Sequence, residues 1–252
     1  MAWKNFTASL AEVLVHEGGF TMNRKDPGNW TGGKVGSGIL KGTKKGIAAA
    51  SFPHLDIRNL TDVQIAGIYE VNYWNKVCGD DLPSGLDLAV FDYGVNSGPS
   101  RSVKDLQRVV GVKADGKMGP VTRRAVMLAD HAKIIKSHCA RRLSFFKSLA
   151  IWNTFGKGWS RRIINVEARA LSWVLTKAEL KEEAKKASQS AGAQAGGAVV
   201  MVPTGGVTID NVGSFPTWLL VALFGVAVAV LFIRAVINYQ RSRTLTAVAK
   251  EA

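Results

Sequence analysis

The sequence predicts a mainly α protein with a small irregular or β loop region near its N-terminus and one apolar helix near its C-terminus. Three observations support this prediction. Apolar residues recur at helical spacing over most of residues 1–176. The stretch 21–55 is instead rich in Gly, Lys and Asn, as loops are. Residues 215–233 form an uncharged run of 19 residues, about enough to cross ~30 Å of hydrocarbon.

The bulk composition narrows the function classes. A chain of 252 residues is long enough for one or two domains, and its net charge of +14 favours polyanionic partners. Nucleic acid is not expected, because the basic residues are scattered and no helix-turn-helix or RNP signature occurs. The two cysteines, Cys78 and Cys139, are interpreted as buried thiols. No Cys/His cluster indicates a metal site, and no cofactor is expected.

The first predicted helix ends in a candidate catalytic acid. Trp3, Leu10 and Glu17 share one face at helical spacing, and Gly18-Gly19 stops the helix. A carboxyl group on this core-facing stripe would be desolvated and would keep its proton, as a general acid requires. The pattern alone still favours a glutamate that turns to solvent at a helix end.

The loop region supplies further polar candidates. Asp26 precedes Pro27-Gly28, and a second carboxylate can hold a water molecule or stabilise an oxocarbenium ion. The alternative is a plain Asp-Pro-Gly turn, which is common. Thr31 and Thr43 add hydroxyl groups to the same loop.

The remaining segments again predict helices. Thr61 and Gln64 form a capping box that opens a helix over 61–76. Residues 86–95 are an apolar helix, and Pro99 and Pro120 suit the first turns of two more. Two long helical patterns follow, at 120–149 and 158–176.

Three ordered motifs resemble a known family. The segments 13–20 (VLVHEGGF), 26–49 and 68–99 are similar to the phage-type N-acetylmuramidases of glycoside hydrolase family 108, which includes phage endolysins. The resemblance implies a lysozyme-like fold and hydrolysis of the β-1,4 bond between N-acetylmuramic acid and N-acetylglucosamine. It also implies that Glu17 is the catalytic acid.

The same resemblance suggests which residues assist the catalytic acid. Glu17 and Asp26 match the Glu-x8-Asp spacing of a phage lysozyme triad, whose third member is a threonine. Thr31 falls one residue early, and Thr43 is the alternative, so the choice stays open.

Four residues further along are expected by resemblance to bind substrate. They are Tyr73, Trp74, Asp92 and Asn96. Aromatic faces stack on sugar rings, while Asp and Asn form hydrogen bonds with hydroxyl and acetamido groups. The alternative for such aromatic residues, and especially for Phe91, is a place in the core.

The predicted organisation has five parts. Residues 1–100 form the lysozyme-like catalytic region, and 101–183 resemble a helical peptidoglycan-binding segment, so peptidoglycan is the expected partner. Residues 184–214, rich in Ala, Gly and Ser, are interpreted as a flexible linker. A transmembrane helix at 215–237 and a basic tail at 238–252 complete the chain.

The charges that flank the apolar run predict its orientation. No Lys or Arg occurs in 195–214, whereas Arg234, Arg241, Arg243 and Lys250 follow the run. The positive-inside rule then places the C-terminus in the cytoplasm and the catalytic region on the periplasmic, wall-facing side of the membrane. Whether a holin is also a partner is left open, as are two other functions: a lytic transglycosylase, or a non-catalytic protein that binds the wall or assists secretion.

Overall fold

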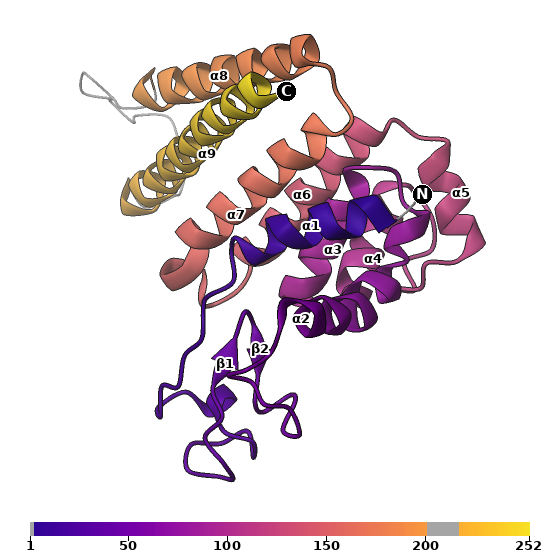
Figure 1. Ribbon diagram of the computed structural model, residues 1–252. Coiled ribbons are helices and arrows are strands. Elements are labelled where there is room, and N and C mark those ends of the chain that lie inside the picture. Colours follow the sequence, from indigo (N-terminus) through magenta and orange to yellow (C-terminus); the bar gives the residue numbers. More distant parts are fainter. Residues whose placement is uncertain (1–2, 201–216) are drawn as a thin grey trace. The chain divides into compact units, whose positions relative to one another are not determined.

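The computed structural model describes residues 3–200 and 217–252, and the chain divides into two compact units, 1–145 and 146–252. The first unit has helices and one small sheet (Figure 1). Its elements are α1 (Trp3–Leu14), β1 (Thr43–Lys44), β2 (Ile47–Ala48), α2 (Asp62–Tyr69), α3 (Leu86–Ser97), α4 (Pro99–Val109), α5 (Pro120–Met127) and most of α6 (His131–Lys147). The predicted mainly α class with a small β loop region is confirmed.

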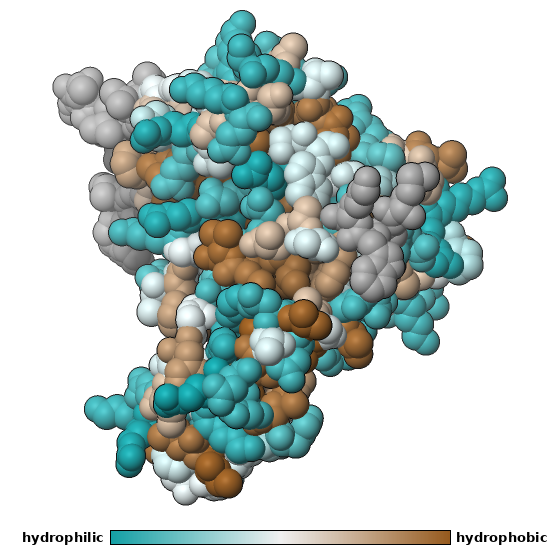
Figure 2. Space-filling view, in the orientation of Figure 1, coloured by the Kyte–Doolittle hydropathy of each residue, from teal (hydrophilic) through white to brown (hydrophobic). Residues whose placement is uncertain are grey.

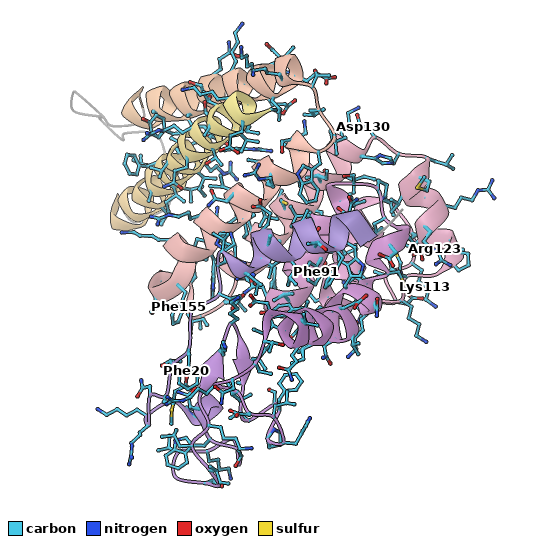
Figure 3. All side chains as sticks on the ribbon, viewed as in Figure 1. Phe20, Phe91, Lys113, Arg123, Asp130 and Phe155 are labelled. Carbon is cyan, nitrogen blue, oxygen red and sulfur yellow. The ribbon has the colours of Figure 1, made fainter. Side chains whose placement is uncertain are left out.

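Helix α3 forms the centre of the first unit. Every residue from Leu86 to Gly94 is buried, because α3 is covered by other helices on several sides. The ring of Phe91 lies against Phe6 and Trp74, with ring centroids 6.1 and 5.3 Å apart (Figure 3). Burial of such rings removes large apolar areas from water and orders the helices that carry them.

The capping box that opens α2 is present. The Thr61 hydroxyl accepts a hydrogen bond from the Gln64 amide at 3.2 Å, and the Gln64 side chain accepts one from the Thr61 amide at 2.9 Å. The predicted helix over 61–76 is not a single α-helix, however. After Tyr69 it continues as a π-helical turn, Glu70–Trp74. Such turns shift the register of side chains and are frequent at functional sites.

The loop region between α1 and α2 is organised by a short hairpin. Strands β1 and β2 pair antiparallel through a two-residue turn in which Lys45 and Gly46 both have positive φ. This is the turn geometry that best matches the twist of a hairpin. Figure 1 shows the hairpin beside α2, and Figure 2 shows mostly hydrophilic side chains over the loop region, with apolar ones at its free end.

The predicted domain boundary at residue 100 falls inside the first unit. Helices α3 and α4 are joined across it by side chains: the Ser102 hydroxyl donates to the Val90 carbonyl at 2.7 Å, and the Tyr93 hydroxyl donates to Asp105 at 2.9 Å. The expected catalytic and peptidoglycan-binding regions therefore share one core up to residue 145.

The second unit consists of α7 (Trp152–Ser172), α8 (Lys177–Val200) and α9 (Thr217–Glu251). The first part of the predicted 184–214 linker belongs to α8, and residues 201–214 lie outside the described residues. Buried alanines, among them Ala187 on α8 and Ala235 on α9, permit close packing within this unit.

The prediction of a membrane-anchored protein is wrong. Within the part of the chain that the structure describes, no helix is long and apolar enough to cross a membrane. Of the expected transmembrane segment 215–237, residues 215 and 216 are not described, and the rest begins α9. This helix continues through the expected cytoplasmic tail 238–252 and packs on α7 and α8, where Arg241 pairs with the buried Glu167.

Candidate active site

Glu17 lies just beyond α1, in the turn that leads into the loop region. The helix ends at Leu14, whose carbonyl accepts from the Glu17 amide at 3.2 Å, so Glu17 is not in the last helical turn as expected. Its side chain is half-buried. The next residue, Gly18, accepts a hydrogen bond from the Lys45 amide at 3.0 Å. The Glu-Gly-Gly motif is thereby attached to the turn of the β1–β2 hairpin.

The Glu17 carboxylate lies against this turn. A Cβ atom added at Gly46 would lie 3.0 Å from Glu17 Oε2 and 2.8 Å from the Tyr69 hydroxyl oxygen. That hydroxyl donates to the Lys45 carbonyl at 2.9 Å. Only glycine leaves room here, and the positive φ of Gly46 also favours glycine. The turn and Tyr69 therefore form one wall beside the carboxylate.

Tyr73 forms another part of the same surroundings. Its half-buried ring lies 5.6 Å from that of Tyr69, centroid to centroid. Burial raises the pKa of its phenol, and the negative charge of Glu17 raises it further. The hydroxyl thus stays protonated and can donate a hydrogen bond near the carboxylate.

Two residues of this arrangement, Gly46 and Tyr69, were not predicted as site residues. The available signals were Gly46, which readily adopts the positive φ of a hairpin turn, and Tyr69, which precedes Tyr73 by one helical turn. What the pattern could not indicate is that the turn folds back onto Glu17.

Asp26 caps a short 3-10 helix, η1 (Pro27–Asn29). Its Oδ1 atom accepts from the Gly28 amide at 2.9 Å, as in the turn-forming alternative. The side chain is nevertheless exposed, and its carboxylate faces solvent.

The two candidate threonines have different surroundings. Thr43 lies on β1, three residues before Gly46, and its hydroxyl donates to the buried Asn29 side chain at 2.7 Å. The Thr31 hydroxyl accepts from the Ile39 amide at 2.8 Å and stabilises the 31–39 loop. Of the two, Thr43 belongs to the hairpin that contacts Glu17.

Trp74 and Asp92 lie in the core. Trp74 is 1% exposed, its ring covers Gly79, and its indole N–H donates to Asp80 at 2.7 Å. Asp92 is fully buried and pairs with the equally buried Arg142 at 2.5 Å. Neither side chain offers a surface to a sugar in this structure.

Asn96 is the exposed end of the same polar network. It lies one helical turn after Asp92 on α3, and its Oδ1 atom accepts from Arg142 Nη2 at 3.2 Å. The network links α3 to α6, so the predicted Asp92 and Asn96 are brought together with Arg142, which sequence reasoning did not select.

Comparisons with known proteins define the class of this molecule. Residues 10–98 match the model described as glycosyl hydrolase 108, and residues 101–164 match a predicted peptidoglycan domain. Among solved structures, that of Brucella abortus SagA is similar, with 39% identity and a TM-score of 0.58, over 68% of this chain and 97% of that chain. Curated proteins contain no match to the chain.

The chain is therefore a glycoside hydrolase. It belongs to the glycosyl hydrolase 108 family. Together with the second matched domain, this membership supports peptidoglycan as its partner and peptidoglycan hydrolysis as its general activity. No comparison supports a holin or a membrane as a further partner.

Proposed function

We propose that the protein is an N-acetylmuramidase that cleaves the β-1,4 bond between N-acetylmuramic acid and N-acetylglucosamine, with Glu17 as the catalytic acid. The observation that carries this proposal is the position of the Glu17 carboxylate, half-buried against the Gly46 turn and next to two tyrosines. Such a position combines partial desolvation with access from solvent, which a general acid needs.

The reaction requires two proton transfers and one nucleophile. Glu17 donates its proton to the glycosidic oxygen as the bond to the anomeric carbon breaks, and an oxocarbenium-like state develops. A water molecule then adds to the anomeric carbon as its proton passes to the second carboxylate of the site. Asp26 is the proposed second carboxylate, and Thr43, rather than Thr31, is the proposed hydroxyl that orients the water.

Substrate contacts are assigned to the accessible members of the predicted set. Tyr73 can stack on a sugar and donate a hydrogen bond, and Asn96 can pair with acetamido or hydroxyl groups. Trp74 and Asp92 are buried and receive no substrate contact in this proposal, and Asp92 is linked to Asn96 through Arg142.

The test is digestion of purified cell-wall sacculi by the full chain, wild type against Glu17→Gln. We expect the variant to lose activity by roughly 10³-fold or more, with an unchanged melting temperature. Glu182→Gln, on the exposed surface of α8, is the matched control and should keep full activity. A Glu17→Gln protein that still digests walls would refute the assignment.

Mass spectrometry of the released fragments separates the alternatives. A reducing muramic acid end indicates hydrolysis, whereas a 1,6-anhydro end indicates a lytic transglycosylase. Wild-type protein that binds sacculi without releasing fragments would indicate the non-catalytic alternative.

The role of Asp26 has its own test. Asp26→Asn keeps the oxygen that accepts from the Gly28 amide and removes only the charge. If the carboxylate takes part in the reaction, activity falls by roughly 10²-fold or more while stability is preserved. Full activity of this variant would show that Asp26 stabilises the turn but takes no part in the reaction.

A further inference from the structure

A cavity of about 480 Å³ lies in the first unit, where α3 ends and α4 begins. Its volume is within the range typical of small-ligand sites. Three of its lining side chains are basic, Arg101, Lys104 and Arg108, and they come from successive turns of α4. None of the residues proposed for catalysis lines it.

The charges around this basic cavity are not balanced. Asp105 is the acid that contacts the cluster, and it already accepts from Arg108 at 2.8 Å, Arg141 at 3.3 Å and the Tyr93 hydroxyl. Among the described residues, Arg101 and Lys104 have no ion-pair partner. The guanidinium of Arg101 instead lies 4.0 Å from the centre of the Phe145 ring, which holds it in place without neutralising it.

Next to the basic cavity, a buried amide holds the 115–117 turn against α4. Gln107 donates to the Asp115 side chain at 2.8 Å and to the Lys117 carbonyl at 3.0 Å, and it accepts from the Gly116 amide at 2.8 Å. These bonds press Gly116 against α4, where an added Cβ would lie 3.1 Å from Lys104 Cε. The end of the Lys104 side chain therefore lies next to Gly116.

We propose that this cavity binds the carboxylate groups of a peptidoglycan stem peptide. The inference rests on the proposed function, because peptidoglycan is the polymer on which that function acts. The glycan strand offers mainly neutral hydroxyl and acetamido groups, whereas the stem peptides carry several carboxylates. Arginine binds carboxylates through two parallel N–H bonds, and lysine adds a compact charge. The cavity thus recognises the peptide, while the Glu17 region acts on the sugar.

The experiment measures calorimetric binding to the full chain carrying Glu17→Gln, which prevents turnover. The probe is the tetrapeptide L-Ala-γ-D-Glu-meso-diaminopimelyl-D-Ala. Neutralising all three cations (Arg101→Gln, Lys104→Gln and Arg108→Gln) should weaken binding about tenfold or more, because charge-assisted bonds are lost.

Two matched variants control for net charge and for folding. Lys76→Gln, Lys113→Gln and Arg124→Gln remove three exposed charges outside the cavity, and this triple variant should bind the tetrapeptide within about twofold of the parent. The charge-preserving triple Arg101→Lys, Lys104→Arg and Arg108→Lys should bind more tightly than the neutralised triple but less tightly than the parent, because two guanidinium groups are lost. An equal loss of tetrapeptide affinity in the two neutralised triple variants would show that only net charge matters, and it would overturn the proposal.

Further probes distinguish binding of peptide carboxylates from binding of other anions such as phosphate. The tetrapeptide with its carboxylates amidated should not bind, and inorganic phosphate should bind more weakly than the tetrapeptide. Phosphate binding that equals or exceeds tetrapeptide binding would overturn the stem-peptide assignment, and so would unchanged binding by the neutralised triple. Sacculus digestion by wild type is measured in parallel: without digestion the proposed function fails, whereas digestion without tetrapeptide binding refutes only the cavity assignment.

Discussion

The loop region, residues 15–60, and the helical region α3 to α6 are stabilised by different interactions. Between residues 15 and 60 the buried apolar side chains are few, namely Ile47, Ala49, Ile57 and Leu60, and the chain is held mainly by hydrogen bonds around the hairpin. The helical region instead buries α3 almost completely and adds a buried polar network. The three proposed catalytic residues, Glu17, Asp26 and Thr43, all lie in this loop region.

Because of this difference, we expect substitutions in the two regions to affect different properties of the protein. Hydrogen-bonded loops can place a carboxylate beside solvent, because their polar groups need not be buried in a core. A packed helical core cannot do so without a desolvation penalty, so its charges are paired, as Asp92 and Arg142 are. Changes in the helical region should therefore lower the free energy of unfolding, and changes in the loop should mainly lower the rate.

The largest expected effect is on stability, from Arg142→Met. The variant leaves the Asp92 carboxylate buried without its cationic partner, which should cost roughly 3–5 kcal/mol of unfolding free energy. Urea denaturation measures the change. The double variant Asp92→Leu with Arg142→Met should recover part of the loss. Equal destabilisation in the single and double variants would show that the charge left behind is not the cause.

His138 should make the helical region sensitive to acid. Burial lowers the pKa of its imidazole to about 4, and the nearby Arg142 charge lowers it as well. Because the unfolded chain binds the proton near pH 6.5 and the folded chain resists it, stability is lost as the pH falls from about 6.5 to 4, by roughly 3 kcal/mol. His138→Gln should remove this component, seen as a smaller stability difference between pH 7 and pH 4. An unchanged difference would exclude His138 as its source.

In the loop region, Gly46→Ala should act on the rate. A methyl group would push against Glu17 Oε2 and the Tyr69 hydroxyl, and a displaced carboxylate should cost roughly 10²-fold in sacculus digestion. Gly36→Ala is the control, because Gly36 also has positive φ but has no atom within 4 Å of an added Cβ. Both variants should lose about 1 kcal/mol of stability from backbone strain. Equal activities would contradict the contact between the turn and Glu17.

The smallest effect is expected from Thr43→Val. It removes the donor to the buried Asn29 oxygen and should cost about 1 kcal/mol. Thr31→Val should cost less, since water can replace its hydroxyl beside the exposed Ile39 amide. Thermal unfolding measures both. If Thr43 orients the water, Thr43→Val also loses activity, whereas Thr31→Val does not. Equal activity in the two variants would contradict the role proposed for Thr43.

Local signals in the sequence predicted much of the helical content. The Thr61–Gln64 capping box, the proline starts at Pro99 and Pro120 and the apolar run of α3 all lie where they were expected. Each depends on interactions between residues close in the chain, which a single sequence displays. The failures involve partners far along the chain. The apolar run after residue 215 suited a membrane by its composition, yet its helix packs on α7 and α8.

The sequence by itself determined the mainly α class, the irregular loop region at 21–55 and Glu17 as the candidate acid, because periodicity, composition and motif order can be read from the chain without its contacts. Only the tertiary structure decided what surrounds them. It placed Gly46 and Tyr69 beside Glu17 and buried Asp92 against Arg142. The physical reason is that burial and charge pairing depend on residues distant in sequence, whose contacts exist only once the helices have packed.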